Sequence, residues 1–75
     1  MPRIDVRERL ITIIELMNSP DGISVRDIQN YFFGIYGTMP DRKSIYRDIY
    51  AVETHLPIEI LHRDGSTFYR FKSFN

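Results

Sequence analysis

The stretch from residue 57 to residue 71, PIEILHRDGSTFYRF, decides the fold of this 75-residue chain. Its apolar residues alternate, and Asp64-Gly65 supplies the positive φ angles that a tight hairpin turn prefers. Counting outward from this turn gives a self-consistent register: Arg63 with Ser66, Leu61 with Phe68, Ile60 with Tyr69, Glu59 with Arg70, and Ile58 with Phe71. One face of the hairpin is then apolar, while Glu59 and Arg70 meet on the other as an opposite-charge pair.

The segment before Pro57 has helical rather than alternating periodicity. Asp41 is placed as the N-cap of a helix from about Arg42 to Thr54, and Pro57 ends it. The apolar face of this helix consists of Ile45, Ile49, Val52 and Leu56. The opposite face carries cations and phenols: Arg42, Lys43, Tyr46, Arg47 and Tyr50. We expect the apolar face to pack on the rest of the domain and the other face to point outward.

Two further amphipathic helices are predicted upstream. The first runs from Val6 to Met17 after Asp5 as N-cap, and five turn-forming residues, 18–22, then reverse the chain. The second begins at a capping box over residues 24–27 and ends near Gly34 or Gly37. The apolar stripe of the first helix is Val6, Leu10, Ile13, Ile14 and Met17, and that of the second is Val25, Ile28, Phe32 and Ile35.

Three helices followed by a two-stranded β-hairpin wing is the order of a winged helix-turn-helix, so the expected fold class is α+β, mainly α. A chain of 75 residues cannot support a second core, so we expect one domain over 1–75. The absence of Cys excludes disulfides and thiolate zinc sites, and favours a cytoplasmic location. No signal peptide or membrane-length stretch is visible, so no membrane role is expected.

Charge and motifs narrow the function classes further. Ten Lys and Arg balance ten Asp and Glu, so a nucleic-acid function must rest on local charge. The two imidazoles, His55 and His62, lack the spacing of a known metal motif. There is no Gly-rich phosphate loop, nucleophile elbow or paired carboxylate set. We therefore expect no enzyme activity, no metal or other cofactor, and no small-molecule site within this chain.

The segment 40–49, PDRKSIYRDI, resembles the recognition helix of the DNA-binding domain of WYL-type bacterial transcription regulators, which are related to DeoR-type winged helices. The family pattern runs Asp or Ser, two basic residues, Ser or Thr, an aliphatic residue, then Tyr-Arg-Asp-Ile. Residues 9–17 and 23–28 resemble its first two helices, and residues 56–59 resemble its entry into the wing. Such regulators usually carry an effector-sensing domain, so this chain is expected to be either one domain of a longer regulator or a small stand-alone regulator.

The resemblance implies sequence-specific binding of double-stranded DNA, with the helix of about residues 42–54 in the major groove. The residue types agree, because cations bind phosphates and Arg47 is able to grip a guanine through two hydrogen bonds. The expected DNA-binding residues are Arg42, Lys43, Ser44, Tyr46, Arg47 and Tyr50 on the helix and Arg63, Ser66 and Thr67 on the hairpin. The hairpin is compact rather than glycine-rich, which argues against deep insertion into a groove.

Other interpretations remain open at this point. The helix cations are alternatively a solvated face, and the zero net charge leaves room for a protein-interaction module such as an antirepressor or adaptor. DNA binding requires the cations to be contiguous and free of carboxylates. Because phosphates repel a carboxylate, we expect Asp48 to have an intramolecular partner such as Arg26. We also expect a homodimer on DNA, because one helix reads few bases and Ile11 and Leu16 offer spare apolar contacts.

Overall fold

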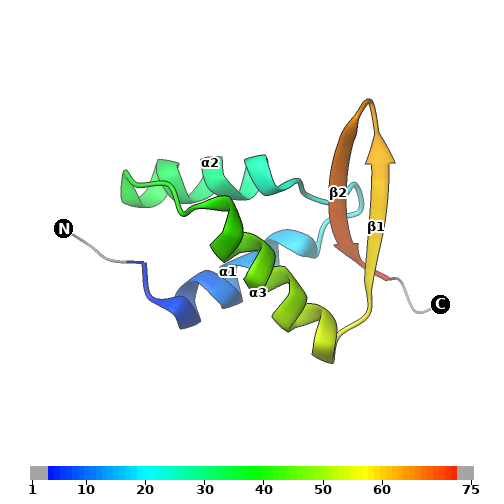
Figure 1. The fold of residues 1–75 in the computed structure, drawn as a ribbon, viewed down its shortest axis with the longest axis horizontal. Coiled ribbons are helices and arrows are strands. Elements are labelled where there is room, and N and C mark those ends of the chain that lie inside the picture. The colour runs from blue at the N-terminus through cyan, green and yellow to red at the C-terminus, as the bar shows by residue number, and fades with distance from the viewer. Residues whose placement is uncertain (1–3, 73–75) are drawn as a thin grey trace.

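Three helices precede a two-stranded antiparallel sheet in the computed structural model, which describes residues 4–72 (Figure 1). The elements are α1 (Val6–Met17), α2 (Val25–Tyr36), α3 (Arg42–His55), β1 (Ile58–Arg63) and β2 (Ser66–Phe71). The hairpin stands at one end of the helices, opposite the C-terminal end of α2 (Figure 1). This α+β, mainly helical arrangement is the winged-helix layout predicted from the sequence. Within residues 4–72, no helix is both long and apolar enough to cross a membrane.

Each helix begins at the cap that the sequence predicts. The carboxylate of Asp5 accepts a hydrogen bond from an amide in the first turn of α1. Ser24 and Asp27 form the reciprocal capping box at the start of α2, with the Asp27 amide 3.1 Å from the Ser24 hydroxyl. Asp41 caps α3 by accepting from the Ser44 amide at 2.7 Å. Asp5 and Asp41 are thus the N-caps of α1 and α3, and Asp27 completes the capping box of α2.

One cluster of apolar side chains forms the core between the three helices. Its fully buried members are Ile13, Met17, Val25, Ile28, Phe32, Ile45, Ile49 and Val52. Three apolar side chains of the hairpin pack against this cluster: Ile58, Tyr69 and Phe71. The core is therefore made mainly by the helical stripes, and the apolar face of the hairpin closes one end of it.

Three residues that the periodicity placed in the core are exposed instead. Val6 is the first residue of α1 and lies beyond the packed part of the helix. Ile35 is 58% exposed, because the core at this end of α2 is filled by Phe32 and by Tyr36, whose rings stack at 6.0 Å. Leu56 follows the last residue of α3 and has extended backbone, so the helical wheel no longer describes its direction.

The hairpin has the predicted register at every pair from Ile58 with Phe71 to Arg63 with Ser66. Two positive φ angles make its turn, 50° at Asp64 and 77° at Gly65. A second pairing ties the hairpin to the helices, because the backbones of Ile23 and Tyr69 exchange hydrogen bonds of 2.9 and 2.8 Å. The loop between α1 and α2 is thus attached to β2 by a single antiparallel β-bridge.

Candidate nucleic-acid interface

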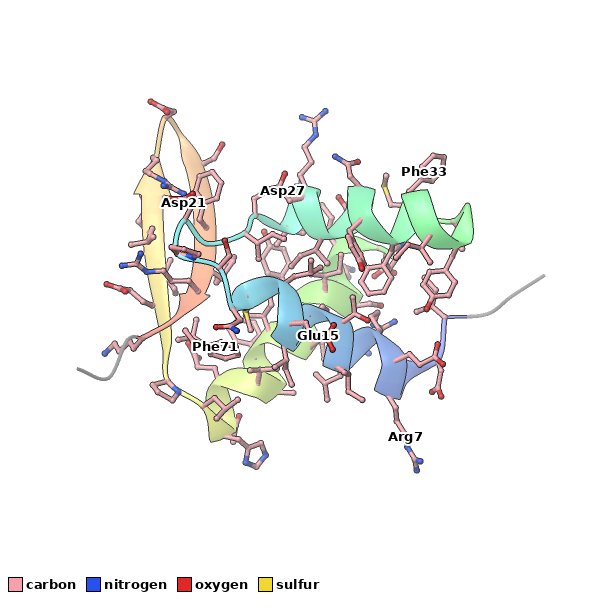
Figure 2. The ribbon with its side chains drawn as sticks, turned by 180° about the vertical axis from the view of Figure 1, so that it is seen from behind. Arg7, Glu15, Asp21, Asp27, Phe33 and Phe71 are labelled. Atoms are coloured by element: carbon pink, nitrogen blue, oxygen red, sulfur yellow. The ribbon has the colours of Figure 1, made fainter. Side chains whose placement is uncertain are left out.

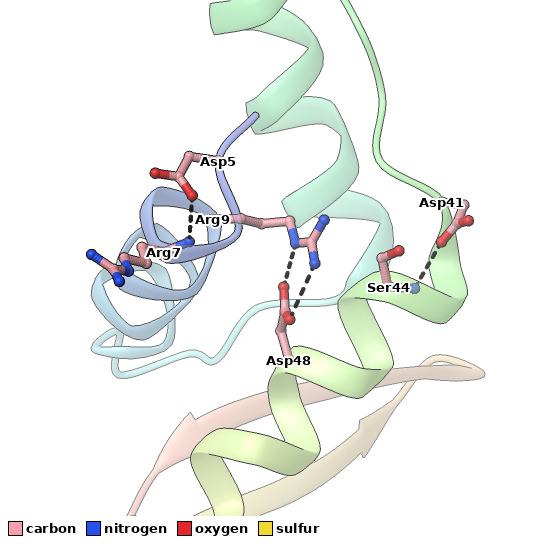
Figure 3. A network of polar contacts seen from close by, with 6 residues as sticks. All are labelled: Asp5, Arg7, Arg9, Asp41, Ser44 and Asp48. Carbon is pink, nitrogen blue, oxygen red and sulfur yellow. Dashed lines mark hydrogen bonds and ion pairs between the residues drawn. The ribbon is translucent and has the colours of Figure 1, made fainter. Parts of the chain in front are cut away.

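An ion pair between α1 and α3 helps to hold α3 in position. Its cationic partner is not the one predicted from the sequence. Asp48 is only 5% exposed, and its partner is Arg9 of α1, not Arg26 (Figure 3). The Arg9 Nε lies 2.5 Å from Asp48 Oδ2 and its Nη2 lies 3.3 Å from Oδ1. Asp48 faces α1 because it lies on the inner side of α3, among the core residues, whereas Arg26 is exposed at the start of α2. The pair therefore orients α3 with its opposite face outward.

The outward face of α3 carries the cations and phenols predicted for it. Lys43, Tyr46, Arg47 and Tyr50 together line a shallow, open hollow whose wall is mostly apolar. Lys43 and Arg47 are exposed, and Tyr50 is 65% exposed. Within the described part of the chain, residues 4–72, no carboxylate lines this hollow. The structure thus brings together four of the six residues predicted on this helix.

A groove of about 330 Å³ runs beside this face, between the starts of α2 and α3 and the tip of the hairpin. Its lining residues are Ser24, Val25, Arg26, Arg42, Tyr46, Gly65, Ser66, Thr67 and Tyr69. Two of them are arginines, several carry hydroxyl groups, and none is a carboxylate. Arg42 of α3 therefore lines the same groove as Ser66 and Thr67 of the hairpin. All three are among the residues predicted from the sequence as DNA contacts.

Tyr46 lines both the hollow and the groove, so the two form one continuous surface. This continuous surface carries four cations, Arg26, Arg42, Lys43 and Arg47, all of them exposed. Among residues 4–72, none of these four forms an ion pair with a carboxylate. We call this set the cationic surface.

Several carboxylates border the cationic surface. Asp41 holds the start of α3, and the amide of Ser44, together with the charge of Arg47, lowers the pKa of its carboxyl. Glu53 lies at the far end of α3 near Tyr69, whose pKa is raised by burial and then by neighbouring charges that include Glu53. Asp41 and Glu53 thus place a negative charge near each end of α3, and the exposed Asp27 and Asp64 follow and precede the groove residues Arg26 and Gly65 in sequence. Among residues 4–72, no carboxylate belongs to the lining of the hollow or of the groove.

The arginines of the hairpin are bound to the chain itself. The guanidinium of Arg63 lies over the Phe68 ring at 4.3 Å from its centroid and donates to the carbonyl oxygen of Asp21. Figure 2 shows Asp21 beside the hairpin. Arg70 pairs with Glu59 at 2.9 Å and also donates to a carbonyl of the same loop. Arg63 consequently does not line the groove, although the sequence predicted it as a DNA contact.

Ser44 is also separated from the other predicted residues. It is half-buried on the side of α3 next to Asp41 (Figure 3), and it lines neither the hollow nor the groove. Its amide serves the helix cap. This contact comes from the backbone, so it fixes the start of the helix without requiring a serine at this position.

Sequence reasoning missed Arg26 and Tyr69 as members of the surface. The sequence analysis predicted Arg26 as the partner of Asp48. Its position in the first turn of α2, on the polar side of that helix, is the signal that could have indicated a different role. Tyr69 lies on the apolar face of the predicted hairpin, which turns toward the helices. Both residues reach the groove because the hairpin and the two helix starts meet there.

Comparison with protein families, curated proteins and solved structures finds no match for this chain. In residues 4–72, no group of three or more His, Cys, Asp or Glu side chains is arranged to hold a metal ion. The class that fold and site define is therefore a winged helix with a cationic, partly aromatic surface on α3 and beside the hairpin.

Proposed function

We propose that this chain is the DNA-binding module of a bacterial transcription regulator, which acts in the cytoplasm by binding double-stranded DNA. In this proposal α3 enters the major groove and the hairpin lies beside the flanking backbone. The supporting observation is the continuity of the cationic surface over Arg26, Arg42, Lys43 and Arg47, without a carboxylate in its lining. The role is binding rather than catalysis, and it needs no cofactor.

Different residues have different tasks in the proposed complex. Lys43, Arg42 and Arg26 bind phosphates, which positions the protein without reading sequence. Arg47 lies one turn after Lys43 in the outer hollow and is long enough to reach a guanine edge, where a guanidinium forms two hydrogen bonds. Ile45 and Ile49, both buried, hold α3 in place behind it. Arg47 is therefore the expected main specificity residue.

The salt dependence of binding to random duplex DNA tests this function. On random duplex DNA, where Arg47 has no preferred base to read, the four cations should make about four phosphate contacts, and the slope of log K against log salt concentration should be roughly −3.6. Exchanging Arg26 and Lys43 together for Ala should weaken binding and make the slope shallower by about 1.8. Arg7→Ala is the matched control, because this exposed cation extends away from the body on α1 (Figure 2). Absence of binding even at low salt, or equal slopes for all variants, contradicts the proposal.

We further propose that two copies bind one palindromic site, because a single recognition helix reads too few base pairs for specificity. Ile11 is 57% exposed on α1 and is available for contact between copies. Leu16 is partly buried against the core and offers less. Sedimentation of the protein with a palindromic duplex should give two chains per duplex, and Ile11→Glu should reduce this. One chain per duplex at saturation contradicts the dimer.

A protein-interaction module is the second candidate, and the C-terminal half of α2 is the observation that favours it. Phe33 extends away from the helices (Figure 2) and is 54% exposed, with Ile35 and Met39 also exposed nearby in the chain. Apolar side chains concentrated in one segment are typical of contact surfaces. The salt experiment separates the candidates, because an adaptor of this kind has no reason to bind random duplex DNA.

A further inference from the structure

The hollow on α3 is apolar although cations frame it. Tyr46 and Tyr50 line it together with Lys43 and Arg47, and most of its lining surface is apolar. Tyr46 and Tyr50 are four residues apart, so they are neighbours on one side of the helix. Two tyrosines on this side of α3, one half-buried and one exposed, are more than phosphate binding requires.

The two tyrosines differ in how firmly they are held. Tyr46 is half-buried and packs against the core cluster, and it also lines the groove beside Tyr69 of the hairpin. Tyr50 is 65% exposed. Tyr46 is thus held by the core, whereas Tyr50 has the larger exposed surface. Burial of that surface by an apolar group would contribute more to the free energy of binding.

The charges around the hollow restrict what is able to cover it. Lys43 and Arg47 attract a polyanion, and the occupant must at the same time present an apolar group. In the major groove of DNA only one such group is displayed by the bases, the C5 methyl of thymine. Guanine, adenine and cytosine display hydrogen-bonding groups there, and these gain nothing from an apolar wall.

We propose that the hollow between Tyr46 and Tyr50 receives the C5 methyl group of a thymine, with Tyr50 as the residue that recognises it. This inference rests on the proposed function and names a specificity within it. The thymine lies next to the base pair that Arg47 reads, because Arg47 lines the same hollow. A sequence preference thus arises from an apolar contact in addition to hydrogen bonds.

Exchange of thymine for uracil tests the proposal, because it removes only the methyl group. The preferred duplex is first selected from a randomised pool, and each thymine in it is then replaced singly by uracil. One replacement per recognition helix should weaken wild-type binding roughly fourfold, which is what burial of about one methyl group is worth. The Tyr50→Ala protein should bind the thymine and uracil duplexes with equal affinity.

Two variants serve as controls. Arg42→Ala should bind more weakly but still discriminate thymine from uracil, because Arg42 lines the groove and not the hollow. Phe33→Ala removes an exposed aromatic ring of α2 and should keep the full discrimination. Circular dichroism of each variant separates loss of contact from loss of fold.

The outcomes distinguish this inference from the function on which it rests. If the protein binds no duplex, both fail together. If it binds with sequence preference, but the preferred site lacks thymine or every uracil exchange is neutral, the thymine contact alone is overturned. It is overturned too if Tyr50→Ala still prefers thymine.

Discussion

Removal of Arg9 should strongly destabilise the fold, because its partner Asp48 is buried between α1 and α3. The two side chains are 14% and 7% exposed and are joined by two hydrogen bonds. Arg9→Met leaves the carboxylate buried without a partner, which costs about 3–5 kcal/mol. A chain of 75 residues is stable by about 4–11 kcal/mol, so this loss is a large part of the total.

Urea unfolding followed by circular dichroism measures the effect. With a denaturant dependence of about 1 kcal/mol per M, the midpoint should fall by roughly 3 M or more. The double variant Arg9→Met, Asp48→Leu replaces the pair by apolar side chains and should return to within about 1 kcal/mol of the wild type. If Arg9→Met costs less than about 1 kcal/mol, or if the double variant is no better, the ion pair does not have this role.

Three more predictions concern α3 and two glycines. Arg47→Ala should cost about 1–3 kcal/mol on the preferred site and relax one base pair in selections, whereas Lys43→Ala should weaken all sequences alike; identical preferences contradict this. Gly22→Ala should destabilise the fold, because φ at this residue is +78° and a Cβ would lie 3.1 Å from a side chain of β2. Gly34→Ala should stabilise α2 by about 0.5–1 kcal/mol, measured by thermal unfolding, because a Cβ there meets nothing within 4 Å. The pKa of the Asp41 carboxyl is lowered in the folded chain, so its negative charge stabilises the fold at pH values above the pKa of an ordinary carboxyl group. This stabilisation is lost as the pH falls through the lowered pKa. Asp41→Asn keeps a cap without the charge, so its stability deficit should shrink in acid, and a deficit independent of pH contradicts this reasoning.

Local signals account for the parts of the fold that the sequence predicted correctly. Asp64-Gly65 determines the turn, and once the turn is known the alternation leaves one register that buries the apolar face. Asp41 and Ser24 are likewise recognisable because a cap bonds to an amide within the next turn. These features depend on residues only a few positions apart.

Two of the errors concern partners that are far apart in the chain. Asp48 lies 39 positions after Arg9, and periodicity shows only that it needs a cation, not which one. Arg63 lies 42 positions after the carbonyl that holds it, in a loop whose pairing with β2 has no signature of its own. The predicted DNA contact of Arg63 and the predicted pairing of Asp48 with Arg26 both follow from this lack of long-range information.

Neutral composition and a cationic surface are compatible because half of the ten carboxylates are used in helix caps and ion pairs. Asp5, Asp27 and Asp41 cap helices, where a negative charge beside the helix N-terminus is stabilising. Asp48 and Glu59 are each paired with an arginine that belongs to another element. The cations of α3 have no such partners in residues 4–72, so they remain as excess charge on one side. Net charge therefore says little about binding in a domain this small, and the distribution of paired and unpaired groups says more.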